Sequence, residues 1–259
     1  MCTAFFYFNQ KNSPQSFTLI FNRDESYSRR SKPLHCWLPQ KNIFAGQDIK
    51  SQGTWLGVNK KGAFAVLTNY RNPKLLKEGL ESRGAIIPRF LEGSQTSFEF
   101  LEELCQDPEA YNPYNLILGN FYPKIRLYYY SNIENKIKKL EDGFYALSNA
   151  LLNTPWPKVS HGLKVFENLV SGSASDEEFF TFMKNKGKAN ISDLPITGIE
   201  SKQELLLSSL FVESKGYGTI TTSLLSFDEK EHKVSFKEVN YRQNKEDKKS
   251  LSFFIKNPS

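Results

Sequence analysis

Short runs of aromatic, β-branched and aliphatic residues recur along the chain, and turn residues separate them. Runs of this length and composition are typical of β-strands in sheets with at least one buried face. They predict strands over residues 3–8, 17–21, 54–59, 63–67, 115–119, 126–130, 144–148, 219–227, 234–241 and 251–255. The polar residues 22–25 are expected to end the second strand, and hairpin loops are expected at 60–62 and 228–233.

Helical signals lie mostly in the middle of the chain. Thr96 and Ser175 each precede a glutamate by three residues, a capping-box pattern that opens a helix. Helices are predicted over residues 82–92 (with a kink at Pro88), 96–105 and 175–186, and in the segment after Pro157. Since no linker rich in Gly, Ser or Pro divides the chain, we expect one α+β domain over residues 1–259, built on antiparallel sheets.

The composition narrows the class of protein. Hydrophobic residues make up 39% and aromatic residues 14% of the 259 positions, as in a folded, β-rich protein. No apolar run approaches the roughly 20 residues of a membrane span, and the N-terminus lacks the pattern of a signal peptide. The net charge of +6 comes without a nucleic-acid recognition motif, so we expect a solvated lysine-rich surface and no nucleic-acid partner.

Three cysteines, Cys2, Cys36 and Cys105, are too few and too scattered for a disulfide framework or a zinc site. They suit a reducing compartment, so we expect a cytoplasmic protein with no metal and no required cofactor. Removal of Met1 before the small Cys2 would leave a thiol and an α-amine on one residue. The amine has a reference pKa of about 7.7–8.0 and can accept the thiol's proton, the pairing used by N-terminal-nucleophile (Ntn) hydrolases. The alternative is that position 2 simply holds a small residue after Met1.

Polar side chains follow several strands that are expected to end near Cys2. If the first two strands pair as a hairpin, Arg23 and Asp24 lie beside Cys2, where a guanidinium lowers a thiol pKa and a carboxylate orients the α-ammonium group. Asn69 and Asn149 each end a predicted strand, where their amides can donate hydrogen bonds to a developing oxyanion. The alternatives are a polar turn capped by Asp24 and asparagines placed by their own turn preference.

These residues stand within motifs that resemble the NRDE family, also called the transport and Golgi organisation protein 2 family. The motifs are Met1-Cys2, Asn22-Arg23-Asp24-Glu25, Tyr27-Ser28-Arg29, Gly53-Thr54-Trp55-Leu56-Gly57, Leu67-Thr68-Asn69-Tyr70, Arg83-Gly84, Tyr145-Ala146-Leu147-Ser148-Asn149-Ala150, Thr154-Pro155-Trp156 and Gly216-Tyr217-Gly218-Thr219. They occur in consistent order from the N-terminus to about residue 240. More remotely, the nucleophile, thiolate-stabilising and oxyanion positions of choloylglycine hydrolases and penicillin V acylases resemble Cys2, Arg23, Asp24, Asn69 and Asn149.

Both resemblances imply a four-layer αββα Ntn-hydrolase-like sandwich of two mainly antiparallel sheets flanked by helices. The nearer one implies a role in intracellular haem handling, in acyl-coenzyme A and lipid metabolism, and in secretory-pathway organisation, without a settled hydrolytic substrate. Relatives commonly carry an arginine after Gly-Thr in the late strand, where this chain has Ile220. The change removes a partner for an anion from that position.

Two functions follow from these observations. The first is an Ntn-type cysteine hydrolase that cleaves a C–N amide or thioester bond of an acyl substrate, with catalytic residues Cys2, Arg23, Asp24, Asn69 and Asn149. The alternative is a carrier of haem or of an acyl-coenzyme A on the same fold, without turnover; a scaffold with no ligand is a third reading. Ligand contacts are expected from Asn22, Glu25, Arg29, Arg30, Trp55, Tyr70 and Trp156.

Haem ligands are sparse in the sequence. His35, His161 and His232 are scattered, and His35 is expected with Cys36 in a loop that carries no haem motif. Haem is therefore expected only as a transient cargo.

Overall fold

Two antiparallel β-sheets form the centre of the computed structural model, which describes residues 1–10, 15–37, 42–242 and 245–255. The first sheet has the order β10-β1-β2-β11-β12-β13, with β1 (Cys2–Phe8), β2 (Phe17–Ser26), β10 (Gly143–Leu147), β11 (Tyr217–Asp228), β12 (Lys233–Arg242) and β13 (Lys245–Phe254). The second runs from β3 to β9 in chain order, with β3 (Ser31–Cys36), β4 (Ile43–Asp48), β5 (Leu56–Asn59), β6 (Ala63–Asn69), β7 (Tyr114–Asn120), β8 (Arg126–Ser131) and β9 (Lys136–Lys139).

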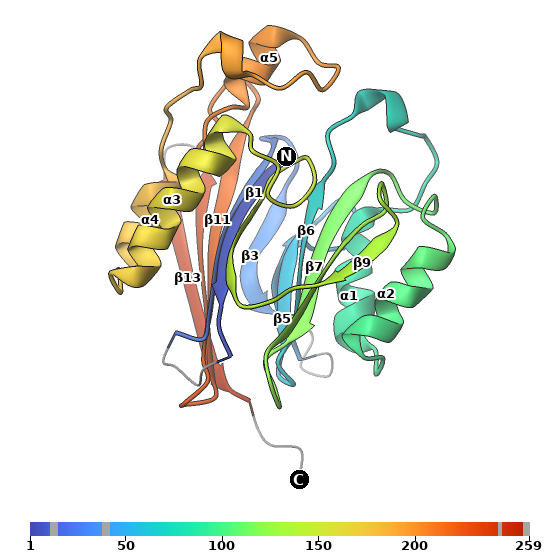
Figure 1. The fold of residues 1–259 in the computed structure, drawn as a ribbon, viewed down its shortest axis with the longest axis vertical. Coiled ribbons are helices and arrows are strands. Elements are labelled where there is room, and N and C mark those ends of the chain that lie inside the picture. Colours follow the sequence, from blue (N-terminus) through green and yellow to red (C-terminus); the bar gives the residue numbers. More distant parts are fainter. Residues whose placement is uncertain (11–14, 38–41, 243–244, 256–259) are drawn as a thin grey trace.

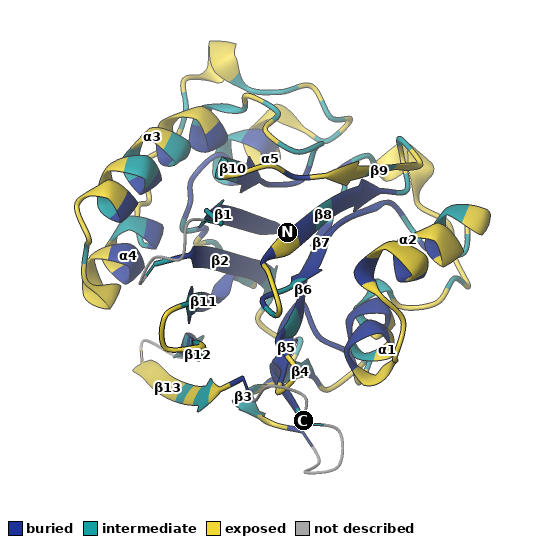
Figure 2. Ribbon diagram, turned by 60° about the horizontal axis from the view of Figure 1, so that its bottom comes forward, coloured by how far each residue is buried: buried dark blue, intermediate teal, exposed yellow. Residues whose placement is uncertain are grey.

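Helices cover the outer face of each sheet (Figures 1 and 2). The first sheet is covered by α3 (Pro157–Ser171) and α4 (Asp176–Met183), and the second by α1 (Ile86–Glu92) and α2 (Ser97–Gln106). Shorter segments are α5 (Ser201–Leu206) and the 3₁₀ turns η1 (Pro73–Leu75), η2 (Arg83–Ala85) and η3 (Ile191–Asp193). The predicted α+β class and the αββα layering are therefore confirmed. Among the described residues, no helix is both long and apolar enough to cross a membrane.

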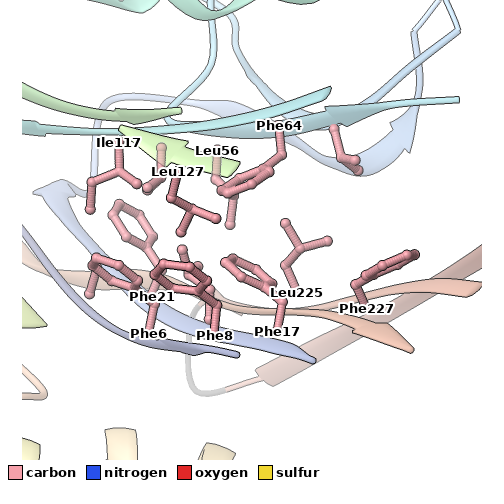
Figure 3. Packing of buried hydrophobic residues seen from close by; sticks show 14 of the residues in the cluster. Phe6, Phe8, Phe17, Phe21, Leu56, Phe64, Ile117, Leu127, Leu225 and Phe227 are labelled. Atoms are coloured by element: carbon pink, nitrogen blue, oxygen red, sulfur yellow. The ribbon is translucent and has the colours of Figure 1, made fainter. Parts of the chain in front are cut away.

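The largest hydrophobic core fills the space between the two sheets. Phe17 and Phe227 extend from the first sheet toward Phe64 on the second (Figure 3). Phe121, directly after β7, packs against all three rings. Ring centroids lie 4.8 Å apart for Phe17 and Phe64, 4.7 Å for Phe64 and Phe121, and 4.7 Å for Phe121 and Phe227. Aromatic pairs at these distances add to the free energy gained by burial, so this cluster joins the sheets firmly.

Strand β2 is longer than the sequence predicts, because the polar residues 22–25 lie within it. Both edges of β2 are occupied: β1 pairs with it on one side and β11 on the other. The backbone groups of these polar residues are thus satisfied by the sheet, and no turn is required. The expected strand end was wrong, and the correction places the polar side chains on alternating faces of a central strand.

Three strands were not predicted, namely β3, β4 and β9. Strand β9 consists of Lys-Ile-Lys-Lys at the sheet edge, where lysines protect an open edge and obscure the strand pattern. Strand β3 contains Pro33 and lies at the other edge, which a proline tolerates. His35 and Cys36 therefore belong to a strand and not to the loop that was expected.

The predicted capping boxes at Thr96 and Ser175 are both present, and they open α2 and α4. Helix α4 ends at Met183, three residues before the predicted end. The helix expected over residues 82–92 is divided into η2, which Ser82 caps, and α1. Pro88 lies in the first turn of α1, where it costs no hydrogen bond, so it is part of the helix start and not a kink.

Candidate active site at the N-terminus

The pairing of β1 with β2 places Cys2 directly opposite Arg23, as the hairpin argument predicted. Side chains alternate along a strand, so Cys2 and Arg23 share the face between the sheets while Asn22 and Asp24 share the opposite face. The side chain of Asn22 donates to the main-chain oxygens of Met183, at 3.0 Å, and Leu210, at 2.9 Å. Asn22 therefore ties β2 to the helical layer instead of facing a ligand beside Cys2.

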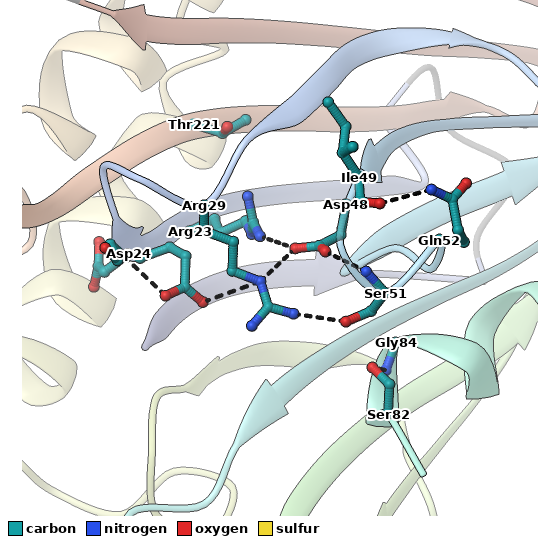
Figure 4. Close-up of polar contacts among 12 residues, drawn as sticks. Arg23, Asp24, Arg29, Asp48, Ile49, Ser51, Gln52, Ser82, Gly84 and Thr221 are labelled. Atoms are coloured by element: carbon teal, nitrogen blue, oxygen red, sulfur yellow. Dashed lines mark hydrogen bonds and ion pairs between the residues drawn. The ribbon is translucent and has the colours of Figure 1, made fainter.

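Arg23 crosses the gap between the two sheets. Its Nη2 donates to Oδ2 of Asp48 at 2.7 Å, and its guanidinium lies 4.1 Å from the ring centroid of Trp55. Nε of Arg29 donates to the same Asp48 oxygen at 2.7 Å, so one carboxylate holds both arginines (Figure 4). Burial opposes the ionised form of Asp48, but the bonds from Arg29 and Ser51 and the two positive charges outweigh it and lower its pKa.

The thiol of Cys2 is only 7% exposed. Burial raises the pKa of this thiol, and the carboxylates of Asp24 and Glu25 add to the rise, against the Met1 ammonium group and Arg23, which favour thiolate. The sequence argument considered only the guanidinium and expected a lowered pKa. The structure corrects this expectation: with Met1 in place, desolvation outweighs the nearby cations.

Asp24 is buried on the other face of β2. Its Oδ1 accepts a hydrogen bond from Oγ1 of Thr219 at 2.6 Å. Its main-chain N–H donates to the oxygen of Met1 at 2.6 Å, and its main-chain oxygen accepts from the Met1 amine. Burial raises the pKa of the Asp24 carboxyl, although the amine and Lys158 oppose the rise. The backbone of Asp24 thus fixes the N-terminus, while its carboxyl has a cationic neighbourhood.

Lys158, in the first turn of α3, is a buried cation that the sequence argument missed. Its Nζ donates to the oxygen of Leu207 at 2.9 Å, and its side chain is near Asp24. Burial lowers the pKa of Lys158 to about 8, although Asp24 favours the charged form. Only its place directly after Thr154-Pro155-Trp156-Pro157 marks it in the sequence.

Lys158 is expected to make stability depend on pH. Between its folded pKa of about 8 and the ordinary lysine value of 10.5, the unfolded chain binds a proton that the folded chain does not. Stability from this group therefore rises with pH above about 8, by at most about 1.4 kcal/mol per pH unit. Urea titrations of the wild type and Lys158→Met at several pH values from 7.5 to 9.5 measure the free energy of unfolding. We expect this free energy to rise less steeply with pH in the variant than in the wild type. The exposed Lys164→Met on the same helix is the control, and equal slopes in all three proteins would contradict the assignment.

The ends of β1, β6 and β10 meet through short hydrogen bonds. Asn149 donates from Nδ2 to the main-chain oxygen of Asn69 at 2.8 Å, and Thr68 donates from Oγ1 to the oxygen of Ser148 at 2.8 Å. Oγ of Ser148 in turn donates to the oxygen of Cys2 at 3.1 Å. The structure thus brings the two predicted asparagines together and links them to Cys2 through Ser148. One N–H of Asn149 is used to hold Asn69, whose own side chain has no hydrogen bond within the described part of the chain.

Four buried side-chain atoms in the described ranges have no hydrogen-bond partner, and they gather around the N-terminus. They are Arg23 Nη1, Asp24 Oδ2, Trp55 Nε1 and Arg71 Nη2. Arg23 lies opposite Cys2 in the pairing of β1 with β2, and its guanidinium covers the ring of Trp55. The main chain of Asp24 and the side chain of Arg71 both contact Met1. Buried polar groups are nearly always paired in folded proteins, so these four atoms have room for a partner such as a water molecule, an ion or a ligand.

Arg71 is a second site residue that sequence reasoning missed. Its Nη1 donates to Oε2 of Glu204 at 2.5 Å, and its guanidinium lies 4.8 Å from the ring centroid of Trp156. Trp156, one of the residues expected to contact a ligand, is thereby brought to the N-terminal site. Tyr70 follows β6, and its main-chain N–H donates to the oxygen of Pro113 at 3.1 Å, which ties this residue to the start of β7. Arg71 and Glu204 are 133 positions apart, so no local pattern relates them.

A cavity of about 1270 Å³ lies next to the N-terminal site. Its lining includes Arg29 and Arg30, as expected for ligand contacts, but neither Cys2 nor Glu25. Glu25 instead accepts a hydrogen bond from the main-chain N–H of Ser26 at 2.8 Å. Ile220 also lines the cavity, from a bulge in β11 where the pairing with β2 shifts between Thr219 and Thr221. The cavity and the Cys2 site are neighbours through β2 and β11.

Residues 1–243 of the chain match the family described as Transport and Golgi organisation 2. The chain belongs to this family. It is 34% identical to the human Transport and Golgi organization protein 2 homolog over 256 residues, which cover 92% of each chain. It is 27% identical to the Drosophila melanogaster Transport and Golgi organization protein 2, over 91% of this chain and 90% of that one.

Two solved structures resemble this member of the Transport and Golgi organisation 2 family at low sequence identity. A single-site variant of the conjugated bile acid hydrolase from Clostridium perfringens is 11% identical with a TM-score of 0.48, over 95% of this chain and 91% of that one. The Caenorhabditis elegans ortholog of N-acylethanolamine-hydrolyzing acid amidase is 8% identical with a TM-score of 0.45, over 88% and 93% of the two chains.

Several motifs that mark the Transport and Golgi organisation 2 resemblance meet in space. A Cβ atom on Gly53 would lie 2.3 Å from the main-chain oxygen of Gly84, and that oxygen accepts a hydrogen bond from Thr54 at 3.1 Å. A Cβ on Gly218 would lie 2.3 Å from Oη of Tyr27 and 2.5 Å from the main-chain oxygen of Val212. Both glycines are required by close approach, because a side chain would collide with the main chain of another segment.

Proposed function

We propose that this protein, after loss of Met1, is an Ntn-type cysteine hydrolase that cleaves a C–N amide or thioester bond of an acyl substrate. Cys2 is the nucleophile. The observation that carries the proposal is the group of unpaired buried atoms on Arg23, Asp24, Trp55 and Arg71, which surrounds the start of β1. A site with a thiol at its centre and three unsatisfied donors around it is suited to bind and polarise an acyl group.

The reaction proceeds in two steps, acylation of Cys2 and hydrolysis of the acyl-enzyme. The Cys2 thiol attacks the carbonyl carbon while its proton passes to the α-amine of the same residue, and the carbonyl oxygen becomes an oxyanion. The oxyanion is stabilised by the amides of Asn69 and Asn149, and the leaving group departs with the proton from the amine. A water molecule then attacks the thioester that joins the acyl group to Cys2 and gives a proton to the α-amine. The thiolate of Cys2 leaves, takes this proton from the amine, and the carboxylic acid is released.

Arg23 and Asp24 have separate roles in this scheme. Arg23 shares the face of β2 with Cys2 and supplies positive charge that favours the thiolate. Asp24 lies on the other face, where its unpaired Oδ2 is suited to hold the α-ammonium group. Loss of Met1 is essential, because the nitrogen of Cys2 is an amide until then and cannot accept a proton.

Alkylation of Cys2 tests the proposal. Two forms of the protein, beginning at Met1 or at Cys2, can be released from an N-terminal fusion partner and treated briefly with iodoacetamide at pH 7.5. We expect Cys2 to react more slowly than the exposed Cys36 in the Met1 form, because burial raises its pKa. In the form that begins at Cys2, we expect Cys2 to be alkylated at least about tenfold faster than in the Met1 form, the change produced by lowering its pKa by one unit.

Peptide mapping by mass spectrometry measures both rates in one sample, with Cys36 as the internal control. Equal reactivity of Cys2 in the two forms would mean that the α-amine does not activate the thiol. That outcome would rule out the Ntn mechanism.

A second candidate function is supported by the cavity beside the site. It is a carrier for an anionic, partly apolar ligand such as an acyl-coenzyme A or haem. The lining combines the cations Arg29, Arg30, Lys184, Lys186 and Lys245 and the carboxylates of Glu213 and Glu246 with the apolar or aromatic Tyr27, Ile49, Phe211, Ile220 and Tyr241. Lys184 pairs with Glu246 and Lys186 with Glu213, so the excess charge is positive. Among the described residues that line the cavity there is no His or Cys, which favours a ligand bound by charge over one held through iron.

A further inference from the structure

Met1 lies in a small site formed by Asp24, Arg71 and Tyr217, here called the seat of Met1, in which each of its polar groups is bound. Its amine donates to the main-chain oxygen of Asp24 and, at 2.7 Å, to Oη of Tyr217. Its own main-chain oxygen accepts from Asp24, and its Sδ accepts from Nε of Arg71 at 3.3 Å. A thioether is a weak acceptor, so Arg71 has a poor partner at this position.

Arg71 is held rigidly beside this seat. It is 8% exposed, its Nη1 is bound to Glu204, and Glu204 is in turn bound by Oγ1 of Thr197. Trp156 lies against the face of the guanidinium. Nη2 is buried and has no partner within the described part of the chain.

The two remaining donors of Arg71 lie on one edge of the guanidinium. Nη1 is on the side of the side-chain stem, so Nε and Nη2 point in parallel, the geometry that binds the two oxygens of a carboxylate. In this structure Nε meets the thioether of Met1 and Nη2 meets nothing that accepts a hydrogen bond. The edge is therefore prepared for a carboxylate and is covered by Met1.

The charges around the seat also favour an anion once Met1 has left. The α-ammonium of Cys2 replaces that of Met1, so that with Arg71 and Lys158 three cations face the two carboxylates of Asp24 and Glu204. An arriving carboxylate would balance the cluster.

We infer that the seat of Met1 is a substrate subsite, in which the Nε–Nη2 edge of Arg71 binds a carboxylate close to the scissile carbonyl. The inference rests on the proposed function, because removal of Met1 opens the seat beside Cys2. It specifies the substrate class as acyl compounds that carry a carboxylate within a few bonds of the amide or thioester. Met1 itself blocks the subsite until it is removed.

Binding to a protein that cannot turn over tests this inference. The Cys2→Ala protein, released from a fusion partner so that it begins at residue 2, is titrated calorimetrically with N-decanoylglycine and with the neutral N-decanoylglycinamide. We expect the carboxylate to bind at least about tenfold more tightly, as for a charge-assisted bidentate pair. The same protein beginning at Met1 is expected to show no preference.

Arg71→Lys keeps the positive charge opposite Glu204, and therefore the fold, but lacks the bidentate edge. We expect it to lose most of the preference for the carboxylate, whereas the surface variant Arg89→Lys keeps it.

The outcomes separate this inference from the proposed function. Equal affinity for the two probes, or a preference that survives Arg71→Lys or the presence of Met1, would overturn the subsite even if the wild type hydrolyses acyl compounds. A preference that depends on Arg71, together with a wild type that hydrolyses no acyl probe, would support the subsite and count against the hydrolase.

Discussion

Replacing Cys2 by alanine is expected to lower the rate of hydrolysis of an acyl substrate by at least about 10⁴-fold, the scale seen when a catalytic nucleophile is removed. The thiol forms the bond to the acyl group, and no neighbouring side chain among the described residues replaces it. Alanine is also small, so Met1 is removed as before and the α-amine is retained. The measurement is kcat/KM for an acyl substrate of the wild type, together with the mass of the acyl-enzyme, which only the wild type forms.

Cys36→Ala and Cys105→Ala are the matched controls for this experiment. Cys36 is exposed and Cys105 is partly buried within α2, and neither lies at the start of β1. Both variants are expected to keep the wild-type rate. Hydrolysis at the wild-type rate by the Cys2→Ala protein would show that the activity arises elsewhere, and the proposed mechanism would be wrong.

The same variant separates the hydrolase from the carrier. Residue 2 does not line the cavity beside the site, so Cys2→Ala leaves its charges and aromatic side chains unchanged. A carrier would bind a long-chain acyl-coenzyme A equally well with or without the thiol. A hydrolase would lose turnover while the fold and any binding in the cavity persist.

Replacing Phe64 by alanine is expected to destabilise the protein by about 3–5 kcal/mol, the cost of removing a fully buried aromatic side chain. Phe64 has no exposed surface, and its ring contacts Phe17 from the opposite sheet and Phe121 from its own. Its loss would leave a void where the two sheets meet. Urea unfolding followed by circular dichroism measures the change in free energy.

Phe98→Ala is the control, because this phenylalanine on α2 is 44% exposed and lies outside the core between the sheets. We expect Phe98→Ala to lower the free energy of unfolding much less than Phe64→Ala does. If both substitutions change the free energy of unfolding equally, the packing of the two sheets against each other does not hold as the structure describes it.

Local patterns were sufficient for most of the elements. Strand β1 and the strands from β5 to β8 contain runs of apolar residues long enough to be recognised without knowledge of their partners. The capping boxes of α2 and α4 are complete within four residues. The edge strands β3 and β9 were missed because Pro33 and the lysines that suit an open edge also weaken the strand pattern.

The candidate site was predictable only in part. The pairing of Cys2 with Arg23 follows from the register of a hairpin, and the meeting of Asn69 with Asn149 follows from two strands that end together. The thiol pKa could not be predicted, because it depends on how much protein surrounds the thiol. The local argument counted the guanidinium and omitted the larger effect of burial.

By itself, the sequence determined most of the strands and helices and the position of a cysteine at the start of a buried strand, because these depend on residues within one strand, one cap or one hairpin. The αββα layering was implied by the family resemblance and not by these local patterns. Only the tertiary structure determined which charged groups surround that cysteine. They include two pairs that join segments far apart in the chain, Arg71 with Glu204 and Lys158 with Asp24. Electrostatic and hydrogen-bond partners depend on distance in space, and burial depends on the whole packed chain. For that reason the sequence could indicate a nucleophile, while only the fold showed the seat of Met1 and the arginine edge beside it.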